Sequence, residues 1–207
     1  MGRSGKARVW LFTVLLALLA TCCTRMSPPA AKAPQAQAPL VRLDVAADVD
    51  FSGPERKAIL EATKAVYDQT GGRVRVDLEF DLDFTDPDGV KEAFEHRWTL
   101  VRLDSNTDIV RMLDFRMGES SGGILGLTLP EQRQVILVAN RLQSPEKFRH
   151  VVMHEFLHAV GVPHVPDRRS LMYPQSVVPH TECMHPADMA ALCDVLHCDP
   201  KQIPACE

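Results

Sequence analysis

The sequence predicts an α+β fold in which helices pack on one mixed sheet. Residues 40–47 and 73–84 alternate apolar and polar side chains with the period of a half-buried strand. Residues 134–140 form a continuous apolar run, which is typical of a strand buried on both faces. Between and after these strands, apolar residues recur at helical spacing. With 207 residues, 45% of them apolar, the chain is long enough for one domain with a substantial core.

The first helix is expected between the two alternating segments. Ser52 and Glu55 form an S-x-x-E capping box at its start, and Gly71-Gly72 marks its end. Its apolar face would consist of Ile59, Ala62 and Val66. The strand that follows would carry one apolar row, formed by Val74, Val76, Leu78, Phe80 and Leu82.

The middle of the chain permits two interpretations. Residues 97–104 and 108–115 indicate two strands joined at Ser105-Asn106, or one strand with an irregular extension. The segment "GGILGLTLP", residues 122–130, predicts a short strand whose glycines allow another backbone to approach closely.

Two helices are expected in the last third. Ser144 is the predicted N-cap of the first, with Pro145 in its first turn and Gly161 at its end. Its apolar surface would be formed by Phe148, Val151, Val152 and Leu157. The second helix is expected from about Pro186 to Leu196, where the apolar residues are Met189, Leu192, Val195 and Leu196.

The first 39 residues are unlike the rest of the chain. Residues 1–21 have a basic start and an apolar run that is too short to span a bilayer but suits a signal peptide. The stretch "LLATC", which ends at Cys22, resembles the bacterial lipoprotein cleavage box, in which the cysteine is acylated. A plain secretory signal or an uncleaved anchor is the alternative. Residues 22–39, rich in Pro, Ala and Gln, then form a tether, and residues 40–207 form the folded domain.

The leader implies an exported protein, either a membrane-anchored lipoprotein of the bacterial cell envelope or a secreted protein. Any contact with a membrane would be through the N-terminal lipid anchor alone. Without residues 1–21 the chain keeps 20 basic and 27 acidic side chains, a balance of −7. A mildly acidic chain with no basic stripe argues against nucleic acid as a partner. We expect a monomer.

Export changes the interpretation of the cysteines. Beyond the leader and tether there are four: Cys183, Cys193, Cys198 and Cys206. An even, clustered set in an oxidising compartment predicts two disulfides near the C-terminus, and three pairings are open. A zinc site made of all four cysteines is the rival, but the chain has no C-x-x-C pair after the leader.

The segment "HEFLHAVGVPH", residues 154–164, predicts a metal centre. His154 and His158 are four residues apart, so on a helix they lie on one face and can bind one zinc ion. Glu155 is then angled past the metal towards a water molecule and is the candidate catalytic base. Gly161 permits a sharp turn out of the helix. The returning chain can present His164 as the third ligand, leaving the fourth position open for catalysis.

Two simpler explanations compete with catalysis. A chance match to H-E-x-x-H is expected in roughly a few per thousand chains of this length, and the further glycine and histidine make it about a thousandfold rarer. A purely structural zinc site usually fills all four positions with Cys or His and has no use for Glu155.

These residues resemble the metzincin metallopeptidases, whose signature is H-E-x-x-H-x-x-G-x-x-H followed by a methionine turn. The segment "SLMYP", residues 170–174, supplies that turn. Met172 comes eight residues after His164, and this short spacing, with Tyr173-Pro174 directly after it, looks most like the matrixin branch.

The resemblance implies a mixed, mostly parallel twisted sheet with two long helices, one of them the active-site helix, and a small C-terminal helical subdomain. Met172 would form the hydrophobic floor beneath the ligands. The segment "GGILGLTL" would be the edge strand on which a peptide substrate docks. Only one zinc ion, the catalytic one, is expected, because residues 104–130 have no counterpart to the histidines of the matrixin structural zinc.

The other candidate ligands are weaker. His150 lies on the same helix face, but histidines at 150, 154 and 158 would span about 12 Å, too far for one ion. His150 is therefore expected to pack beside the site, and His96, His180, His185 and His197 to lie at the surface. The turn "TDPDG" resembles a calcium loop, but Phe84 stands where the first acid is needed, so calcium remains a candidate that the pattern does not support.

The predicted function is zinc-dependent hydrolysis of peptide bonds in a peptide or protein substrate. Zinc would polarise the scissile carbonyl, and Glu155 would take a proton from water and deliver it to the leaving amine. Two alternatives remain open: a non-catalytic binding module that keeps the zinc fold, and a zinc amidase that acts on cell-wall peptides.

Overall fold

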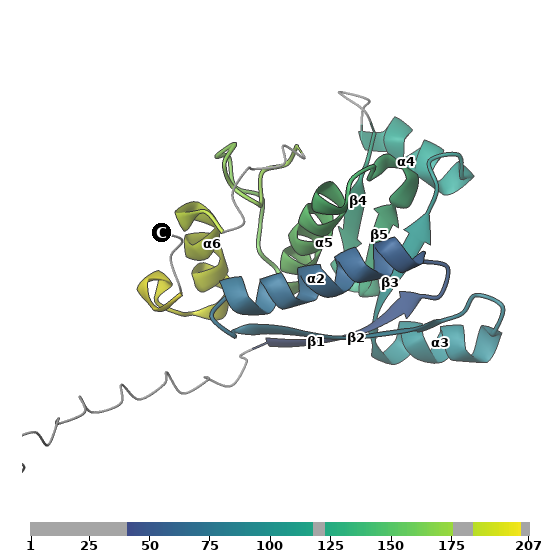
Figure 1. The fold of residues 1–207 in the computed structure, drawn as a ribbon, viewed down its shortest axis with the longest axis horizontal. Coiled ribbons are helices and arrows are strands. Elements are labelled where there is room, and N and C mark those ends of the chain that lie inside the picture. Colours follow the sequence, from purple (N-terminus) through teal and green to yellow (C-terminus); the bar gives the residue numbers. More distant parts are fainter. Residues whose placement is uncertain (1–40, 118–122, 176–183, 204–207) are drawn as a thin grey trace, which may run out of the picture. The chain divides into compact units, whose positions relative to one another are not determined.

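The computed structural model describes residues 41–117, 123–175 and 184–203. The chain divides into two compact units, residues 1–35 and 36–207, and the fold described is that of the second. Its sheet has five strands in the order β2-β1-β3-β5-β4 (Figure 1). Their bounds are Val41–Asp48 for β1, Val74–Leu82 for β2, Trp98–Leu103 for β3, Gly126–Leu129 for β4 and Gln134–Val138 for β5.

The sheet is mixed and mostly parallel, which confirms the predicted α+β fold. The pairs β2–β1, β1–β3 and β3–β5 are parallel, and the pair β5–β4 is antiparallel. Parallel neighbours need crossover connections. The helices are α2 (Gly53–Gln69), α3 (Pro87–His96), α4 (Asp108–Met117), α5 (Pro145–Val160) and α6 (Pro186–Leu196). None in the described ranges is long and apolar enough to span a bilayer.

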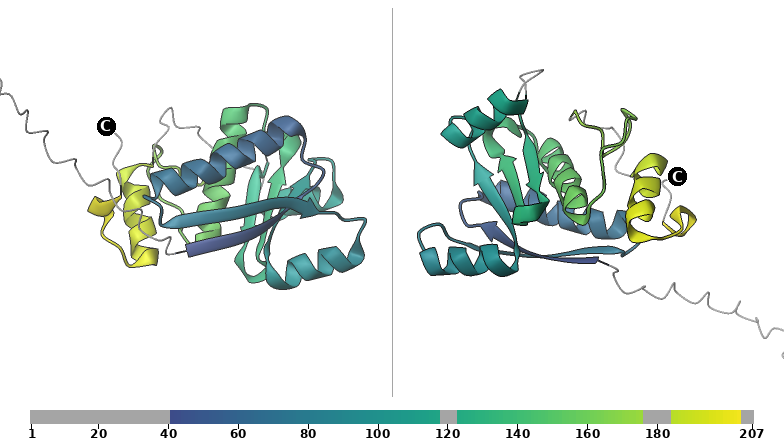
Figure 2. Two further views of the ribbon diagram at one scale, coloured as in Figure 1. Left: turned by 60° about the horizontal axis from the view of Figure 1, so that its bottom comes forward. Right: turned by 180° about the vertical axis from the view of Figure 1, so that it is seen from behind.

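Helices cover both faces of the sheet. On one face α2 packs against α5, and the two share the main core with inward residues of β1 such as Val45 and Ala47. On the opposite face Ala46 contacts the smaller cluster under α3 (Figures 1 and 2). This alternation along β1 follows from the two-residue period of a strand.

The ends of α2 and α5 agree with the sequence. Glu55 and Ser52 form the predicted capping box of α2. The Ser144 hydroxyl accepts a hydrogen bond from the Lys147 amide at 3.1 Å at the start of α5. Gly161 ends α5 with a φ of 101°, a conformation that favours glycine.

The predicted strand at residues 108–115 is wrong, because this segment is the helix α4. Its apolar residues satisfy both the strand and the helix period, so periodicity alone could not decide. The deciding feature is Thr107, whose carbonyl accepts from the Arg111 amide and whose hydroxyl accepts from the Val110 amide at 3.4 Å. Val110 is buried, and Arg141 anchors the helix through two bonds to Asp114, of 3.0 and 2.6 Å.

The helix α3 begins inside "TDPDG", at Pro87, so the last three residues of the expected turn are helical and the helix is absent from the sequence interpretation. Pro87 occupies its first turn, where proline costs no hydrogen bond. Val90, Ala93 and Phe94 pack against the outer face of the sheet.

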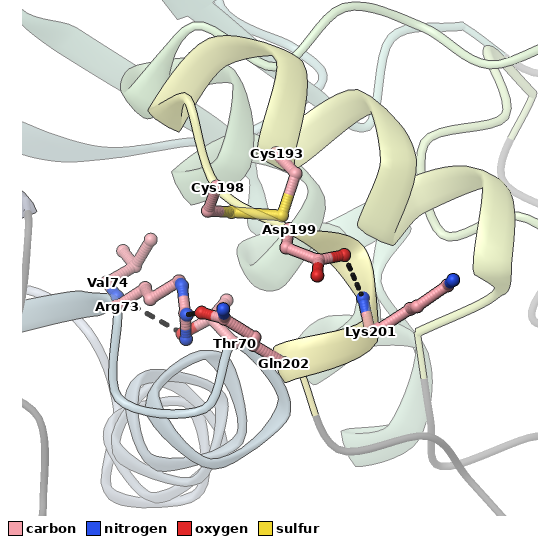
Figure 3. The surroundings of a disulfide bond; sticks show 8 residues. All are labelled: Thr70, Arg73, Val74, Cys193, Cys198, Asp199, Lys201 and Gln202. Atoms are coloured by element: carbon pink, nitrogen blue, oxygen red, sulfur yellow. Dashed lines mark hydrogen bonds between the residues drawn. A yellow bond between two sulfur atoms is a disulfide. The ribbon is translucent and has the colours of Figure 1, made fainter.

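The C-terminal segment is joined to α6 by a disulfide between Cys193 and Cys198 (Figure 3). These two cysteines are therefore not ligands of a four-cysteine zinc site, while Cys183 and Cys206 lie outside the described residues. Beyond the bridge, Gln202 accepts a hydrogen bond from the buried Arg73 guanidinium at 2.8 Å, and Ile203 is buried. The disulfide thus helps to hold residues 198–203 against the start of β2.

Candidate metal centre

The three predicted histidine ligands come together in the structure. One ring nitrogen from each of His154, His158 and His164 lies within 4.8 Å of the other two. His154 and His158 are one turn apart on α5, and the left-handed Gly161 lets the chain return with His164. The Nε2 atoms of His158 and His164 are 3.1 Å apart.

The outer nitrogens of the two helical histidines are held by backbone carbonyls. His154 Nδ1 lies 2.7 Å from the Leu171 carbonyl, and His158 Nδ1 lies 2.8 Å from the Val162 carbonyl. A carbonyl oxygen can only accept, so each Nδ1 carries the hydrogen and each Nε2 keeps its lone pair. This is the second partner that metal-binding histidines usually have.

Burial favours the neutral form of all three rings. It lowers the pKa of His154 to about 3 and lowers the pKa values of His158 and His164 as well. The donor set is therefore three neutral imidazoles, which suits zinc and leaves room for a fourth ligand.

Glu155 lies on the same helix, between the two histidines, but its side chain is directed to β4. Only 5% of the residue is exposed, and burial raises the pKa of its carboxyl group to about 7, against the hydrogen bond from Thr128. That bond joins Thr128 Oγ1 to Glu155 Oε2 at 2.7 Å. A carboxyl group with a pKa near neutrality can both accept and return a proton.

The methionine turn is held by a buried carboxylate that the sequence interpretation missed. Asp188, in the first turn of α6, accepts hydrogen bonds from the Leu171 amide at 2.9 Å and the Met172 amide at 3.1 Å. It also accepts from the Ser170 hydroxyl. Met172 is fully buried, and its carbonyl accepts from the Val165 amide, next to His164.

The turn is thereby connected to the ligands. Leu171 donates its amide to Asp188 and offers its carbonyl to His154, so α6 helps to fix the His154 ring. The available sequence signal was the capping box at the start of α6, in which Asp188 reaches back to the His185 amide. The additional hydrogen bonds that Asp188 accepts from the methionine turn could not be predicted, because they depend on how α6 packs against that turn.

The remaining histidines are placed apart from the triad. His150 is half-buried, and burial lowers its pKa to about 4, although the nearby Asp188 opposes this. His96 and His197 are exposed as expected, whereas His180 lies outside the described residues. His185 differs from expectation, because its ring caps α6 and lies 3.7 Å from Asp167, with 21% of the side chain exposed.

Comparison with known proteins identifies the family to which the chain belongs. The matrixin family model matches residues 49–195. Among solved structures, the chain is similar to a zinc-dependent peptidase from Methanocorpusculum labreanum, with 14% identity over 73% of this chain and 99% of that one and a TM-score of 0.47. It is also similar to archaemetzincin from Methanopyrus kandleri, with 16% identity over 81% and 99% and a TM-score of 0.48. No curated protein matches significantly.

The family match covers most of the domain. It extends from the start of α2 to the end of α6 and includes the histidine triad, Glu155 and Met172. The chain therefore belongs to the matrixin family of zinc metallopeptidases.

Proposed function

We propose that the protein is a zinc-dependent metalloendopeptidase that cleaves peptide bonds in peptide or protein substrates. His154, His158 and His164 would hold the ion, and Glu155 would be the general base. The observation that carries the proposal is the pairing of three converging neutral imidazoles with an adjacent buried carboxyl group. A structural zinc site needs converging imidazole ligands, but it does not need a buried carboxyl group beside them.

The chemistry divides between the ion and the protein. When bound, zinc supplies a Lewis acid that polarises the scissile carbonyl and makes water a stronger nucleophile. Glu155 takes a proton from that water and returns it to the leaving amine. Burial tunes Glu155 for both steps, because a pKa of about 7 balances proton uptake against release.

The edge of the sheet supports a peptide as substrate. β4 is the last strand of the sheet, and in the described ranges only β5 pairs with it. An extended peptide can add to such an edge through backbone hydrogen bonds. Because Thr128 of β4 also contacts Glu155, a peptide on this strand would pass close to the base.

The test is the substitution Glu155→Gln, assayed on a mixture of unfolded proteins and on peptidoglycan. The wild-type protein should cleave protein, lose activity with a chelator and regain it with zinc. The variant should bind one equivalent of zinc and lose at least about a hundredfold in kcat, the usual contribution of a general base.

The matched control is Glu146→Gln, which changes an exposed carboxylate on the same helix. It should behave as wild type. Full peptidase activity of Glu155→Gln would contradict the assignment. If the wild-type protein cleaved peptidoglycan alone, it would be an amidase. If the wild-type protein bound zinc but cleaved neither substrate, it would be a binding module.

We also propose that the protein is exported and anchored through an acylated Cys22. The support is the leader of residues 1–21, with its basic start and short apolar run, and the tether of residues 22–39.

A further inference from the structure

Two residues of β4, Gly126 and Thr128, contact the side chain of Glu155. Residues two apart in a strand point to the same face, and this face of β4 lies against α5. We propose that Gly126 and Thr128 are positioning residues that hold the Glu155 carboxyl group in one orientation. The inference rests on the proposed function, in which Glu155 is the general base.

Gly126 provides the space that the carboxyl group occupies. A Cβ atom at this position would lie 2.5 Å from Glu155 Oε1 and 2.8 Å from its Cγ, closer than real contacts allow. Gly126 lies in a regular strand and is not among the glycines with positive φ. Glycine is therefore needed here for space and not for backbone conformation.

Thr128 provides a hydroxyl group with two partners on Glu155. Its Oγ1 lies 2.7 Å from Oε2 and 3.0 Å from the backbone carbonyl oxygen of the same residue. A hydroxyl donates one hydrogen and can accept others. It can donate to the ionised carboxylate, or accept from the carboxylic acid while donating to the carbonyl, so Oε2 keeps a partner in either form.

The anchor for this contact is rigid. Thr128 is β-branched, which restricts its χ1, and its backbone pairs with Val135 of the neighbouring strand β5. Glu155, in contrast, has a long side chain with several rotatable bonds. A general base must lie within hydrogen-bonding reach of the proton it takes, and a displacement of about 1 Å can cost about a hundredfold in rate.

The hydroxyl is tested by Thr128→Val, which keeps the shape, and Thr128→Ser, which keeps the hydroxyl. Thr128→Val should lower kcat about tenfold with KM within twofold of wild type, and Thr128→Ser should restore kcat to within about threefold. The zinc content of both should equal that of wild type. In a Glu155→Gln background, Thr128→Val should cause no further loss, because Thr128 acts through Glu155.

The chain offers a matched control in Thr99, which is buried in β3 and whose hydroxyl has no hydrogen-bond partner among the described residues. Thr99→Val removes the same atoms from the same sheet and should leave both constants unchanged. If kcat of Thr128→Val equals that of Thr99→Val, the role of the hydroxyl is refuted.

The space is tested by Gly126→Ala. This change should lower kcat about tenfold or more while zinc binding persists, and a crystal structure of the zinc-free variant should show the Glu155 side chain displaced. Gly53→Ala is the control, because a Cβ atom there would have no neighbour within 4 Å. An undisplaced carboxyl group with wild-type kcat would refute the role of Gly126.

These outcomes are distinct from a failure of the proposed function. If the wild-type protein cleaves no protein or peptide, the proposed function fails. If the wild type is active and the variants match their controls, only the positioning role fails.

Discussion

The two helical histidines are oriented by groups that carry no charge. His154 and His158 each donate Nδ1–H to a backbone carbonyl, at Leu171 and Val162. A carboxylate in the same place would strongly favour the charged imidazolium ring, whereas a carbonyl fixes the tautomer and favours protonation much less. Burial therefore dominates and keeps Nε2 unprotonated. The Nε2 atoms of both rings are therefore free of hydrogen and available to a metal ion without prior loss of a proton.

This arrangement predicts how zinc affinity depends on pH. Three imidazoles with an ordinary pKa of 6.5 would each be half protonated at pH 6.5, which would weaken zinc binding about eightfold relative to pH 8. Because burial lowers the pKa of all three ligands, proton competition moves to lower pH. We therefore expect a smaller change over this range than for three free imidazoles.

The measurement is competition with a chelator at several pH values. It should use the Glu155→Gln variant, so that the carboxyl group with a pKa of about 7 does not titrate in the same range. An eightfold loss by pH 6.5 would show that the rings titrate as free imidazoles.

Four elements build the site, and one of them, α6, takes part through the methionine turn. Helix α5 carries His154, His158 and Glu155, the chain after Gly161 carries His164, and β4 supports Glu155. Helix α6 supports the methionine turn, because Asp188 in its first turn accepts hydrogen bonds from the amides of Leu171 and Met172. A short helix near the C-terminus thereby stabilises the turn that orients the first ligand.

The substitution Asp188→Asn tests this support. An amide group has one acceptor oxygen where the carboxylate has two, so at least one buried donor of the turn loses its partner, at a cost of about 1–3 kcal/mol. The variant should unfold at lower temperature and bind zinc about tenfold more weakly, the usual effect of losing a partner behind a ligand.

Thermal unfolding of the zinc-free protein and chelator competition give the two quantities. The control is Asp194→Asn, an exposed carboxylate on the same helix, which should change neither. The role of Asp188 is wrong if the two variants behave alike.

The sequence predicts those parts of the site that are close together along the chain. His154, Glu155 and His158 lie in one helix, whose geometry is fixed, so their relative positions follow from spacing alone. Thr128 and Asp188 reach the site through packing between distant segments. Their residue types are common, and no local pattern distinguishes them from a strand threonine or a helix cap.

The errors in the fold have a similar origin. Strands with strict alternation, such as residues 73–84, were placed correctly because a polar face is incompatible with burial. The segment of α4 was predicted wrongly. Its apolar residues Ile109, Met112 and Phe115 are exposed, so their spacing does not mark a buried face. Capping residues such as Thr107 were the better evidence there.

At the scale of the whole molecule, the sequence predicts a leader and a tether before the folded unit. The charge pattern supports this, since the first eight residues contain three basic side chains and the remainder is acidic. An acyl chain on Cys22 would contribute about 0.8 kcal/mol for each methylene group buried in a bilayer. The tether would then keep the enzyme at a membrane while leaving it free to meet its substrates.

The proposed anchor is tested by Cys22→Ser in a bacterial host fed with labelled fatty acid. The wild-type protein should take up the label and sediment with membranes, and the variant should do neither. Cys23→Ser is the adjacent control and should be labelled normally. Labelling of Cys22→Ser would show that another residue is acylated. Sedimentation of Cys22→Ser with membranes, but without label, would indicate an uncleaved leader.

The Cys193–Cys198 disulfide has a practical consequence for anyone who prepares this protein. The bridge lies near the far end of α6, the helix that carries Asp188 in its first turn, and it holds the segment of Gln202 and Ile203. Cytosolic expression in an ordinary host keeps thiols reduced, so it yields the dithiol form. Material from the periplasm and material from the cytosol are then two different samples, and their activities are comparable only after the thiols have been counted.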